Sequence, residues 1–338
     1  MAPRVTVVIP NWNGERFLNL CLPSLRRQSF EDFETILVDN GSTDASVDFT
    51  RLNFPEVRVI ALSDNRGFSA AVNAGIRASE TEYVALLNND AEVDPGWLEA
   101  LVCAAGSHPE AGLFASKLVD FHDRRLLDGA GDALRRSGLP YRIGHRELDR
   151  GQYERETFVF SACAAAALYR RTLFEEIGPF DEDFFAYCED GDVSFRAQLA
   201  GYRCLYIPGA IVYHVGSAST GGKRSATATR LGTQNGINLL VKNLPRALVW
   251  RNLPSLLAGQ LSRVVVTSFS SAGLRAHLGG LAGAWRLLPR MLEKRKKIQN
   301  RRRVSDGYVR QLLRESSRQA TESRRRRIGD QIRLRLGW

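Results

Sequence analysis

Runs of apolar residues alternate with helical repeats along the first hundred residues of the chain. Four short β-branched and aliphatic runs predict buried strands over residues 5–10, 34–39, 57–62 and 82–87. Apolar residues at helical spacing predict helices over residues 15–28 and 65–79, and a further helix from Asp94-Pro95 onward. Strands that alternate with helices predict an α/β fold, with a doubly wound, mostly parallel sheet flanked by helices.

The pattern is less regular between residues 111 and 220. Residues 112–121 predict a strand, and residues 157–171 predict a strand or buried segment. Residues 129–156 are polar and rich in glycine, so we expect a surface loop or flap there. Residues 184–219 predict an acidic turn, a helix, a strand and a loop that holds His214. From residue 228 the pattern is helical, which predicts a helical C-terminal extension.

Polar side chains follow each of the predicted strands. In parallel sheets, ligands bind beyond the carboxyl ends of the strands. The sequence therefore predicts a ligand site at this edge of the sheet. The polar residues at these positions are Asn11, Asn13, Asp39, Asn40, Asn65, Asn88 and Asp90.

The segment "VALLNNDAEVD" (84–94) is a buried run that ends in oxygen-bearing side chains. If the chain stays extended, Asn88, Asp90 and Glu92 point to one side of the strand. Ligands of this kind suit Mg²⁺ or Mn²⁺, which often bridge to substrate phosphates. The alternative is a polar turn that caps the strand and starts the next helix.

Two further groups lie at predicted strand ends or before helices. Asp39 needs hydrogen-bond donors, which a ligand base, a ribose or nearby backbone amides could supply. Gly67 would let a ligand approach closely, although helix packing also explains the small residues after it.

Three acids, Glu189, Asp190 and Asp192, precede an amphipathic segment and follow a group of aromatic residues. Asp192 could cap the helix, and because one acid suffices for a cap, Glu189 and Asp190 are candidate general bases. His214 follows "AIVY" at another strand end, where it is either structural or part of the site.

Six segments carry a family resemblance: "VIPNWNG", "ILVDNGSTD", "NRGFSAAVNAGI", "LLNNDAEV", "GPFDEDFFAYCEDGDVSFRAQLAGY" and "YHVGSAS". In order and spacing, this set resembles the family 2 glycosyltransferases with the GT-A fold, and most closely their bacterial rhamnosyltransferase-like branch. The resemblance covers residues 4–220.

The resemblance implies a role for each matching position. Asp90 would hold Mg²⁺ or Mn²⁺ with help from His214, because the first position of the metal-binding element is the neutral Asn88. Asp190, with Glu189 beside it, would be the catalytic base. Ser161 departs from the glycine that the family often carries on the acceptor side. The nucleotide-sugar donor would be bound by Pro10, Asn11, Asn13, Asp39, Asn40, Ser42, Asn65, Gly67, Asn73, Asn88 and Asn89.

The implied activity is an inverting transfer of a sugar from a nucleotide-diphosphate sugar, either dTDP-rhamnose or a UDP-sugar. The acceptor would be a hydroxyl of a glycan or a polyprenyl-linked glycan in cell-surface polysaccharide synthesis. Two alternatives stay open. One is a non-catalytic nucleotide-sugar-binding protein of the same fold. The other is a sugar nucleotidylyltransferase, although "VIPNWNGERF" lacks the glycine-rich, basic phosphate loop that such an enzyme needs.

Composition and charge add information about the compartment and the C-terminal part. The five cysteines form no CxxC pair, which argues against a disulfide scaffold or a zinc site. We expect no signal peptide and no transmembrane helix. Residues 221–338 contain 26 basic and 5 acidic residues, whereas residues 1–220 contain 21 basic and 32 acidic residues. We therefore expect two units, a catalytic domain over 1–220 and a basic helical region over 221–338.

Three interpretations of the basic region compete. Arginine-rich runs bind nucleic acid, but no recognised nucleic-acid module accompanies them. A solvated, partly disordered tail is the second interpretation. We favour the third, peripheral binding to an anionic membrane, because leucines alternate with arginines over residues 253–290. The expected location is therefore cytoplasmic, on the inner face of the cell membrane, with no nucleic-acid partner.

Overall fold

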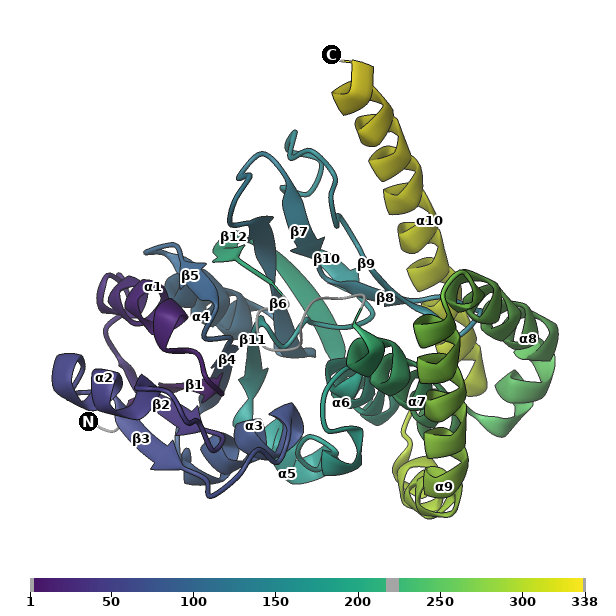
Figure 1. Ribbon diagram of the computed structural model, residues 1–338, viewed down its shortest axis with the longest axis horizontal. Helices are drawn as coiled ribbons and strands as arrows, with labels where there is room; N and C mark the ends of the chain where they lie inside the picture. The colour runs from purple at the N-terminus through teal and green to yellow at the C-terminus, as the bar shows by residue number, and fades with distance from the viewer. Residues whose placement is uncertain (1–2, 217–224, 337–338) are drawn as a thin grey trace.

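A ten-stranded mixed sheet forms the centre of the computed structural model, which describes residues 3–216 and 225–336 (Figure 1). A separate two-stranded pair, β8 with β9, lies beside it. The strands are β1 (Val5–Asn11), β2 (Phe33–Asp39), β3 (Arg58–Ala61), β4 (Tyr83–Leu87), β5 (Ala91–Val93), β6 (Ala111–Asp120), β7 (Leu127–Ala130), β8 (Asp132–Leu134), β9 (Pro140–Arg142), β10 (Thr157–Val159), β11 (Ala166–Arg170) and β12 (Arg203–His214).

The strand order brings the polar strand ends to one edge. The order along the sheet is β10-β12-β6-β11-β4-β1-β2-β3, with β5 added to β12 and β7 added to β6. β3, β2, β1 and β4 pair in parallel, and β6 pairs in parallel with β12. β11 is antiparallel to both β4 and β6, so β6 and β12 run in the same direction as β1. The mostly parallel α/β sheet predicted from the sequence is therefore confirmed.

Helices cover both faces of the sheet. α1 and α4 pack on one face with Val5, Val7 and Ile9 of β1. α3, α5 and α6 pack on the other face with Val8. Side chains of β1 thus alternate between two apolar layers, as expected of a strand buried on both faces. The helices before β12 are α1 (Glu15–Arg26), α2 (Ser46–Asn53), α3 (Phe68–Ala78), α4 (Trp97–Ser107), α5 (Arg171–Ile177), the 3₁₀ helix η1 (Glu182–Phe184) and α6 (Glu189–Ala200).

Two local predictions are wrong. Residues 129–156 are not only a surface loop: they contain β8 and β9 and the end of β7, with Ala133, Leu134 and Ile143 buried. The apolar residues are too few and too scattered among glycines to produce a readable strand period. The extended run also does not continue beyond β4, because the chain turns at Asn89 and Asp90.

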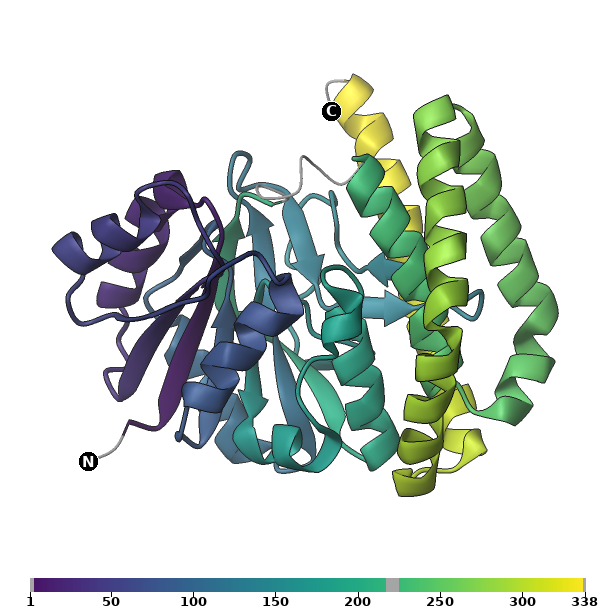
Figure 2. The ribbon, with the colours of Figure 1, turned by 60° about the horizontal axis from the view of Figure 1, so that its bottom comes forward.

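The C-terminal helices pack against the sheet domain and against one another (Figure 2). Met291, Val309, Leu313 and Ala320 are buried, so the disordered-tail interpretation is wrong for the described residues. The proposed unit boundary at residue 220 lies outside the described residues. None of the described helices contains a stretch long and apolar enough to cross a bilayer. These helices are α7 (Ala226–Asn243), α8 (Arg246–Ser268), α9 (Ser271–Arg301) and α10 (Asp306–Leu336).

Candidate functional site

Buried amides and an acid meet where β1 and β2 end. The parallel register places Asn11 beside Asp39, and Nδ2 of Asn11 donates to Oδ1 of Asp39 at 3.0 Å. Oδ1 of Asn11 accepts from Nδ2 of Asn89 at 2.7 Å. The backbone N–H of Ser42 donates to Oδ2 of Asp39 at 3.0 Å. These contacts hold one acid at the strand edge in a fixed orientation, and each carboxylate oxygen keeps room for another donor.

The loops after β1 and β3 are tied to this cluster. Asn13 has a left-handed backbone (φ 49°), and its Oδ1 accepts from the backbone N–H of Thr43 at 2.8 Å. Nδ2 of Asn40 donates to Oδ1 of Asn65 at 3.1 Å and to the carbonyl of Gly67 at 3.1 Å. Pro10 lies within β1, one residue before Asn11. The structure thus brings most of the predicted donor-binding residues together.

Gly67 is required by its conformation and its neighbour. Its φ is +86°, and a Cβ at this position would lie 2.6 Å from the ring of Phe185. The backbone N–H of Ser69 also donates to the carbonyl of Phe185 at 3.2 Å. Gly67 therefore joins the loop before α3 to the loop before α6.

Asn73 and Glu92 have other partners. Nδ2 of Asn73 donates to the carbonyl of Phe180 and to Glu182, while its Oδ1 accepts from the backbone N–H of Phe180. Glu92 pairs with Arg124 at 2.8 Å and with Arg27 at 3.6 Å. The expectation that Glu92 faces the same side as Asp90 is wrong, because the turn after β4 breaks the period. We leave both Asn73 and Glu92 out of the candidate site.

Asp90, in the turn after β4, faces His214 at the end of β12. Both are buried, and Nε2 of His214 lies 3.4 Å from Oδ1 of Asp90. On its other side, Nδ1 of His214 lies 2.8 Å from Oδ2 of Asp128. Burial lowers the pKa of His214, but the contacts with Asp128 and Asp90 outweigh burial and raise it to about 9. His214 is the last residue of β12 and not part of the loop after it.

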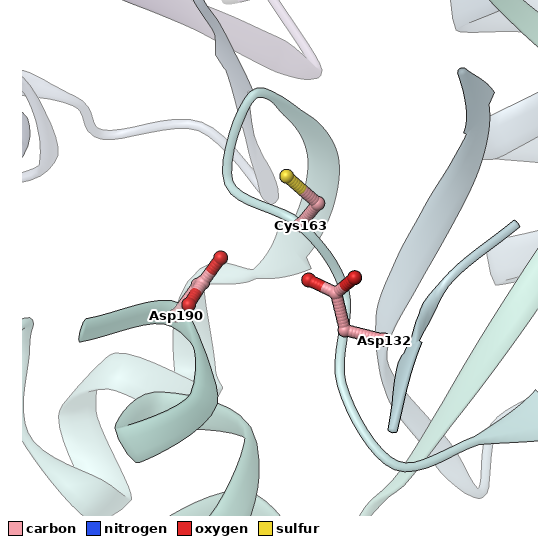
Figure 3. Close-up of side chains that lie close together, drawn as sticks. All are labelled: Asp132, Cys163 and Asp190. Carbon is pink, nitrogen blue, oxygen red and sulfur yellow. The ribbon is translucent and has the colours of Figure 1, made fainter. Parts of the chain in front are cut away.

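Arg142 connects this acid–histidine pair to a second acidic group. Its guanidinium contacts Asp128 at 3.2 Å, Asp132 at 3.1 Å and Sγ of Cys163 at 2.6 Å. Asp132, Cys163 and Asp190 each present a ligand atom within 4.8 Å of the others. Figure 3 shows the carboxylates of Asp132 and Asp190 on facing segments, with Cys163 on the loop beyond them. Arg142 already supplies a cation to this group, so we do not assign a metal ion there.

Glu189 and Asp190 differ in their environments at the start of α6. Burial and the charge of Asp190 raise the pKa of Glu189 to about 8, and Oε2 of Glu189 has no hydrogen-bond partner within the described chain. Burial and the charge of Asp132 raise the pKa of Asp190 to about 6, opposed by Arg142. At neutral pH, Glu189 is therefore mostly protonated and Asp190 is mostly ionised. Asp190 is the better candidate for a proton acceptor.

Helix α7 fixes the loop that precedes these acids. Phe185, Tyr187 and Cys188 all have positive φ, which is costly for residues with a Cβ. Nδ2 of Asn235 lies 2.7–2.9 Å from the carbonyls of Phe184, Ala186 and Tyr187. A residue outside the motif region thus stabilises a strained loop next to the candidate base.

Asp192 ties α6 to α7 and does not face the candidate site. It is fully buried and accepts hydrogen bonds from Arg196, Lys242 and Asn243. Burial alone would raise its pKa, but Lys242 and Arg196 lower it to about 2. Its role is structural, beyond the simple helix cap expected from sequence.

The residues around Asp90 fit a divalent cation. Nε2 of His214 is buried and has no well-formed hydrogen bond among the described residues. Carboxylate and imidazole donors suit a divalent ion, and Asp128 on Nδ1 would orient the ring as an outer partner. Because Asp90 and Asp128 favour the protonated ring, a cation would have to displace the proton from Nε2 as it binds. Asn88 lies next to this pair, half-buried.

Sequence reasoning missed Asp128, Asp132, Arg142 and Asn235. The first three lie within or beside the segment assigned to a surface loop, and the last lies in the C-terminal helices. A usable signal was present in "DGAGDA" (128–133), where small residues separate two acids. A Cβ at Gly129 would lie 2.9 Å from the side chain of Arg142, so the glycine makes room for the guanidinium that joins these acids.

A cavity of about 870 Å³ lies elsewhere, between α6, η1 and α9. Its lining includes Asn73, Lys294 and Arg301, but not Asn11, Asp90 or Asp190. We therefore define the candidate site by the side-chain contacts at the strand ends and not by this cavity.

Comparisons with known proteins place the chain in a family. Residues 6–178, about half of the chain, match the model described as glycosyl transferase family 2. The N-acetylglucosaminyl-diphospho-decaprenol L-rhamnosyltransferase of Mycobacterium tuberculosis is 29% identical over 245 residues, covering 65% of this chain and 79% of that protein. The PGL/p-HBAD biosynthesis glycosyltransferase of Mycobacterium bovis is 29% identical over 278 residues, covering 75% of this chain and 97% of that protein.

A solved structure of a glycosyltransferase has the same fold as this chain. The mannosyltransferase PcManGT from Pyrobaculum calidifontis, in complex with GDP-Man and Mn²⁺, superposes with a TM-score of 0.54 at 16% sequence identity. The superposition covers 95% of this chain and 86% of the mannosyltransferase chain. This likeness confirms the GT-A fold expected from the sequence, and the family match rules against a nucleotidylyltransferase. The chain belongs to glycosyl transferase family 2, and its relatives include a rhamnosyltransferase.

Proposed function

We propose that the protein is an inverting, metal-dependent transferase that moves a sugar from a nucleotide-diphosphate donor to an acceptor hydroxyl. The observation that carries this proposal is the pair of chemically different acidic centres. Asp90 with His214 provides donors for a divalent cation, and Asp190 provides a base whose pKa is about 6. Arg142 and Asp128 connect the two centres.

In this proposal, the donor lies along the carboxyl edge of the sheet. Asp39 and Asn11 would bind the nucleotide, while Asn40, Ser42, Asn65, Gly67, Asn13 and Pro10 shape the loops around it. A bound Mg²⁺ or Mn²⁺ would offset the charge that develops on the leaving diphosphate. Asp90 and His214 would hold it, with Asn88 and Asn89 beside them.

The transfer step is a single displacement. The acceptor oxygen attacks the anomeric carbon as the bond from that carbon to the diphosphate oxygen breaks. The hydroxyl proton passes to Asp190, which burial keeps basic enough to accept it. One displacement inverts the anomeric centre.

For the acceptor, the relative from Mycobacterium tuberculosis has a name that describes a diphospho-decaprenol substrate. By analogy we propose a polyprenyl-linked glycan in cell-surface polysaccharide synthesis, with dTDP-rhamnose or a UDP-sugar as the donor. The enzyme would act on the cytoplasmic face of the membrane, bound to an anionic surface through the region 221–338.

A pair of variants at the proposed metal site tests the proposal. Asp90→Ala should abolish transfer and lower the affinity for donor in the presence of Mn²⁺. Asn88→Asp should be tolerated or should increase the apparent affinity for Mn²⁺, because it adds a carboxylate. Near-wild-type transfer by folded Asp90→Ala would show that the metal assignment is wrong.

A non-catalytic nucleotide-sugar-binding protein of the same fold is the second candidate, favoured only by the neutral Asn88. Metal-dependent release of nucleotide diphosphate in the absence of acceptor would exclude it.

A further inference from the structure

The solvent-facing side of α8 is apolar, where a surface helix normally carries polar residues. Trp250, Leu257 and Leu261 are 65%, 61% and 64% exposed. The exposed positions at three- and four-residue spacing along this side are Trp250, Pro254, Leu257, Ala258, Leu261 and Val265. We call this set the α8 stripe.

Helix α9 repeats the arrangement. Its exposed positions Leu278, Ala282, Trp285, Pro289 and Leu292 form the α9 stripe, again at three- and four-residue spacing. Trp285 is 75% exposed. The buried side of α9 packs on α7, and α8 and α9 lie side by side at one edge of the molecule (Figure 2). Two neighbouring helices thus each carry a row of exposed apolar side chains, and exposed apolar surface of this kind marks an interaction site.

The charge around the stripes defines the partner. Residues 193–292 contain no Asp or Glu, whereas α8 and α9 as far as Leu292 contain six arginines. A second copy of this chain would bring two cationic surfaces together, which disfavours a homodimer. An anionic lipid surface matches both the apolar rows and the positive charge. Trp250 and Trp285 suit the boundary between headgroups and acyl chains.

A cationic pocket lies directly beside the α8 stripe. A cavity of about 520 Å³ between α8, α10 and the β8–β9 segment is lined by arginines and hydroxyls and contains no acid. Its lining residues include Arg135, Arg136, Arg324, Ser137, Ser255, Ser262, Ser317 and Thr321, and Ala258 belongs to both the lining and the stripe.

The arginines of this pocket lack anionic partners. In the part of the chain that the structure describes, Arg135, Arg136 and Arg324 form no ion pair, and Nε of Arg135 is buried without a hydrogen bond. Burial and the charges of Arg324 and Arg327 lower the pKa of Arg135. Unneutralised guanidiniums with adjacent hydroxyls are suited to bind a phosphate group.

We propose that α8 and α9 dock on an anionic bilayer, with both stripes in the interfacial layer and a lipid phosphate in the arginine pocket. The proposal deepens the membrane part of the proposed function and rests on it. It assigns lipid binding to these helices and not to the terminal arginine runs as a whole.

Sedimentation of the full chain with vesicles tests the proposal. Vesicles of phosphatidylcholine with one quarter phosphatidylglycerol should bind the protein, and pure phosphatidylcholine vesicles should bind it less. Leu257→Ser with Leu261→Ser should lower the partition coefficient at least about tenfold. The matched control is Leu52→Ser, because Leu52 is 83% exposed on α2, and it should change nothing.

A second pair of variants tests the pocket. Arg324→Gln should reduce binding to anionic vesicles about fivefold, the effect of roughly 1 kcal/mol per charge. Arg325→Gln is the control, because it removes the same charge from the neighbouring exposed position of α10, outside the pocket lining, and should have a smaller effect.

Several outcomes would overturn the proposal. If Arg324→Gln and Arg325→Gln lose vesicle binding equally, the pocket is not a lipid-phosphate site. If the double leucine variant binds vesicles as the wild type does, the stripes do not contact the bilayer. If the wild type is a dimer and the double leucine variant is a monomer, the stripes bind a second copy of the chain and not a bilayer. A thermal shift with inorganic phosphate, lost in Arg324→Gln without any vesicle binding, would assign the pocket to a soluble phosphate. Transfer to a soluble acceptor should be unchanged in all these variants, so a failure here is distinguishable from a failure of the proposed function.

Discussion

At the scale of single residues, two acids two positions apart in α6 have opposite electrostatic environments. Asp190 is buried near Asp132, so its ionised form is disfavoured, whereas Asp192 is buried against Lys242 and Arg196, so its ionised form is favoured. A folded protein tolerates an unfavourable buried charge such as that of Asp190 where the charge is needed for chemistry. The contrast predicts that neutral substitutions at the two positions have opposite effects on stability.

Asp190→Asn should lower the transfer rate about 10²-fold or more while the affinity for donor holds. Because the base acts in its ionised form, the wild-type rate should fall tenfold per pH unit below about pH 6, and the variant should lose this dependence. Steady-state kinetics across pH 4.5–8 measure both effects. An equal loss of donor affinity would instead mark Asp190 as a binding residue.

The same variant should be more stable than the wild type at pH 8. The pKa of Asp190 is raised from 3.8 to about 6, so ionisation costs stability as pH rises through this interval, and the cost is complete above it. Removing the charge should therefore add about 1–3 kcal/mol to the free energy of unfolding at pH 8 and little at pH 3. Urea unfolding at both pH values measures the difference. Destabilisation at pH 8 would contradict the assigned environment.

Asp192→Asn should destabilise the fold by about 3–5 kcal/mol at pH 7, because it leaves Lys242 and Arg196 buried without their shared partner. The pKa of Asp192 is lowered to about 2, so its contribution is present above pH 4 and is lost as pH falls towards 2. Glu56→Gln is the control: its pair with Arg26 is half-exposed on both sides and should be worth less than about 1 kcal/mol. Equal effects of the two variants on urea unfolding would contradict the buried-pair account.

At the scale of elements, α7 stabilises the loop that carries the candidate base. Asn235→Ala should leave three carbonyls without their donor beside three residues of positive φ. We expect a loss of about 1–3 kcal/mol in stability and a larger loss in kcat than in donor affinity.

Asn238→Ala is the matched control for Asn235→Ala, because Asn238 is buried on the same helix and its Nδ2 has no partner among the described residues. It should cost less in both stability and kcat. If the two alanine variants behave alike, the clamp role of α7 is wrong.

Elements with a clear pattern of apolar residues could be predicted from the sequence, and elements without such a pattern could not. β1, β2 and β4 are mostly apolar; β1 and β2 end in Asn11 and Asp39, and Asn88 follows β4. Parallel pairing alone then brings these three residues to one edge. The β7–β9 segment shows no clear hydrophobic period, because its few large buried residues, Leu127, Leu134 and Ile143, are separated by glycines, alanines and polar residues. Asp128, Asp132 and Arg142 were missed for this reason.

Contacts between residues that are distant in sequence also could not be predicted. Asn235 reaches a loop some fifty positions earlier, and Asp128 reaches His214 across 86 positions. No local pattern encodes such contacts, since they depend on how helices and loops pack after the sheet has formed.

At the scale of the whole molecule, the C-terminal helices are part of one packed structure. Ser316 and Ser323 of α10 accept hydrogen bonds from the backbone N–H groups of Leu134 and Gly144, and Asp330 accepts one from Leu148. These contacts support the segment that carries Asp132 and Arg142. Helix α10 therefore stabilises the candidate site, although no motif residue lies in it.

A chain that ends at residue 304 should lose this support and expose the surface against which Val309 and Leu313 pack. We expect the Tm to fall by about 10 °C or more, and transfer to a soluble acceptor to fall with it. Thermal unfolding of both chain lengths measures the change. An unchanged Tm with full activity would show that α10 is a dispensable appendage.

In the proposed function, this edge of the sheet transfers a sugar from a nucleotide-diphosphate donor. The most direct measurement is the release of nucleotide diphosphate from a panel of dTDP-rhamnose, UDP-sugars and GDP-mannose, with Mn²⁺ and with a chelator. We expect release from at least one donor with Mn²⁺, loss of that release with the chelator, and a loss of about 10²-fold or more in Asp190→Asn. If the folded wild type releases nucleotide diphosphate from none of these donors, or if the chelator and Asp190→Asn leave the release unchanged, the proposed function is wrong.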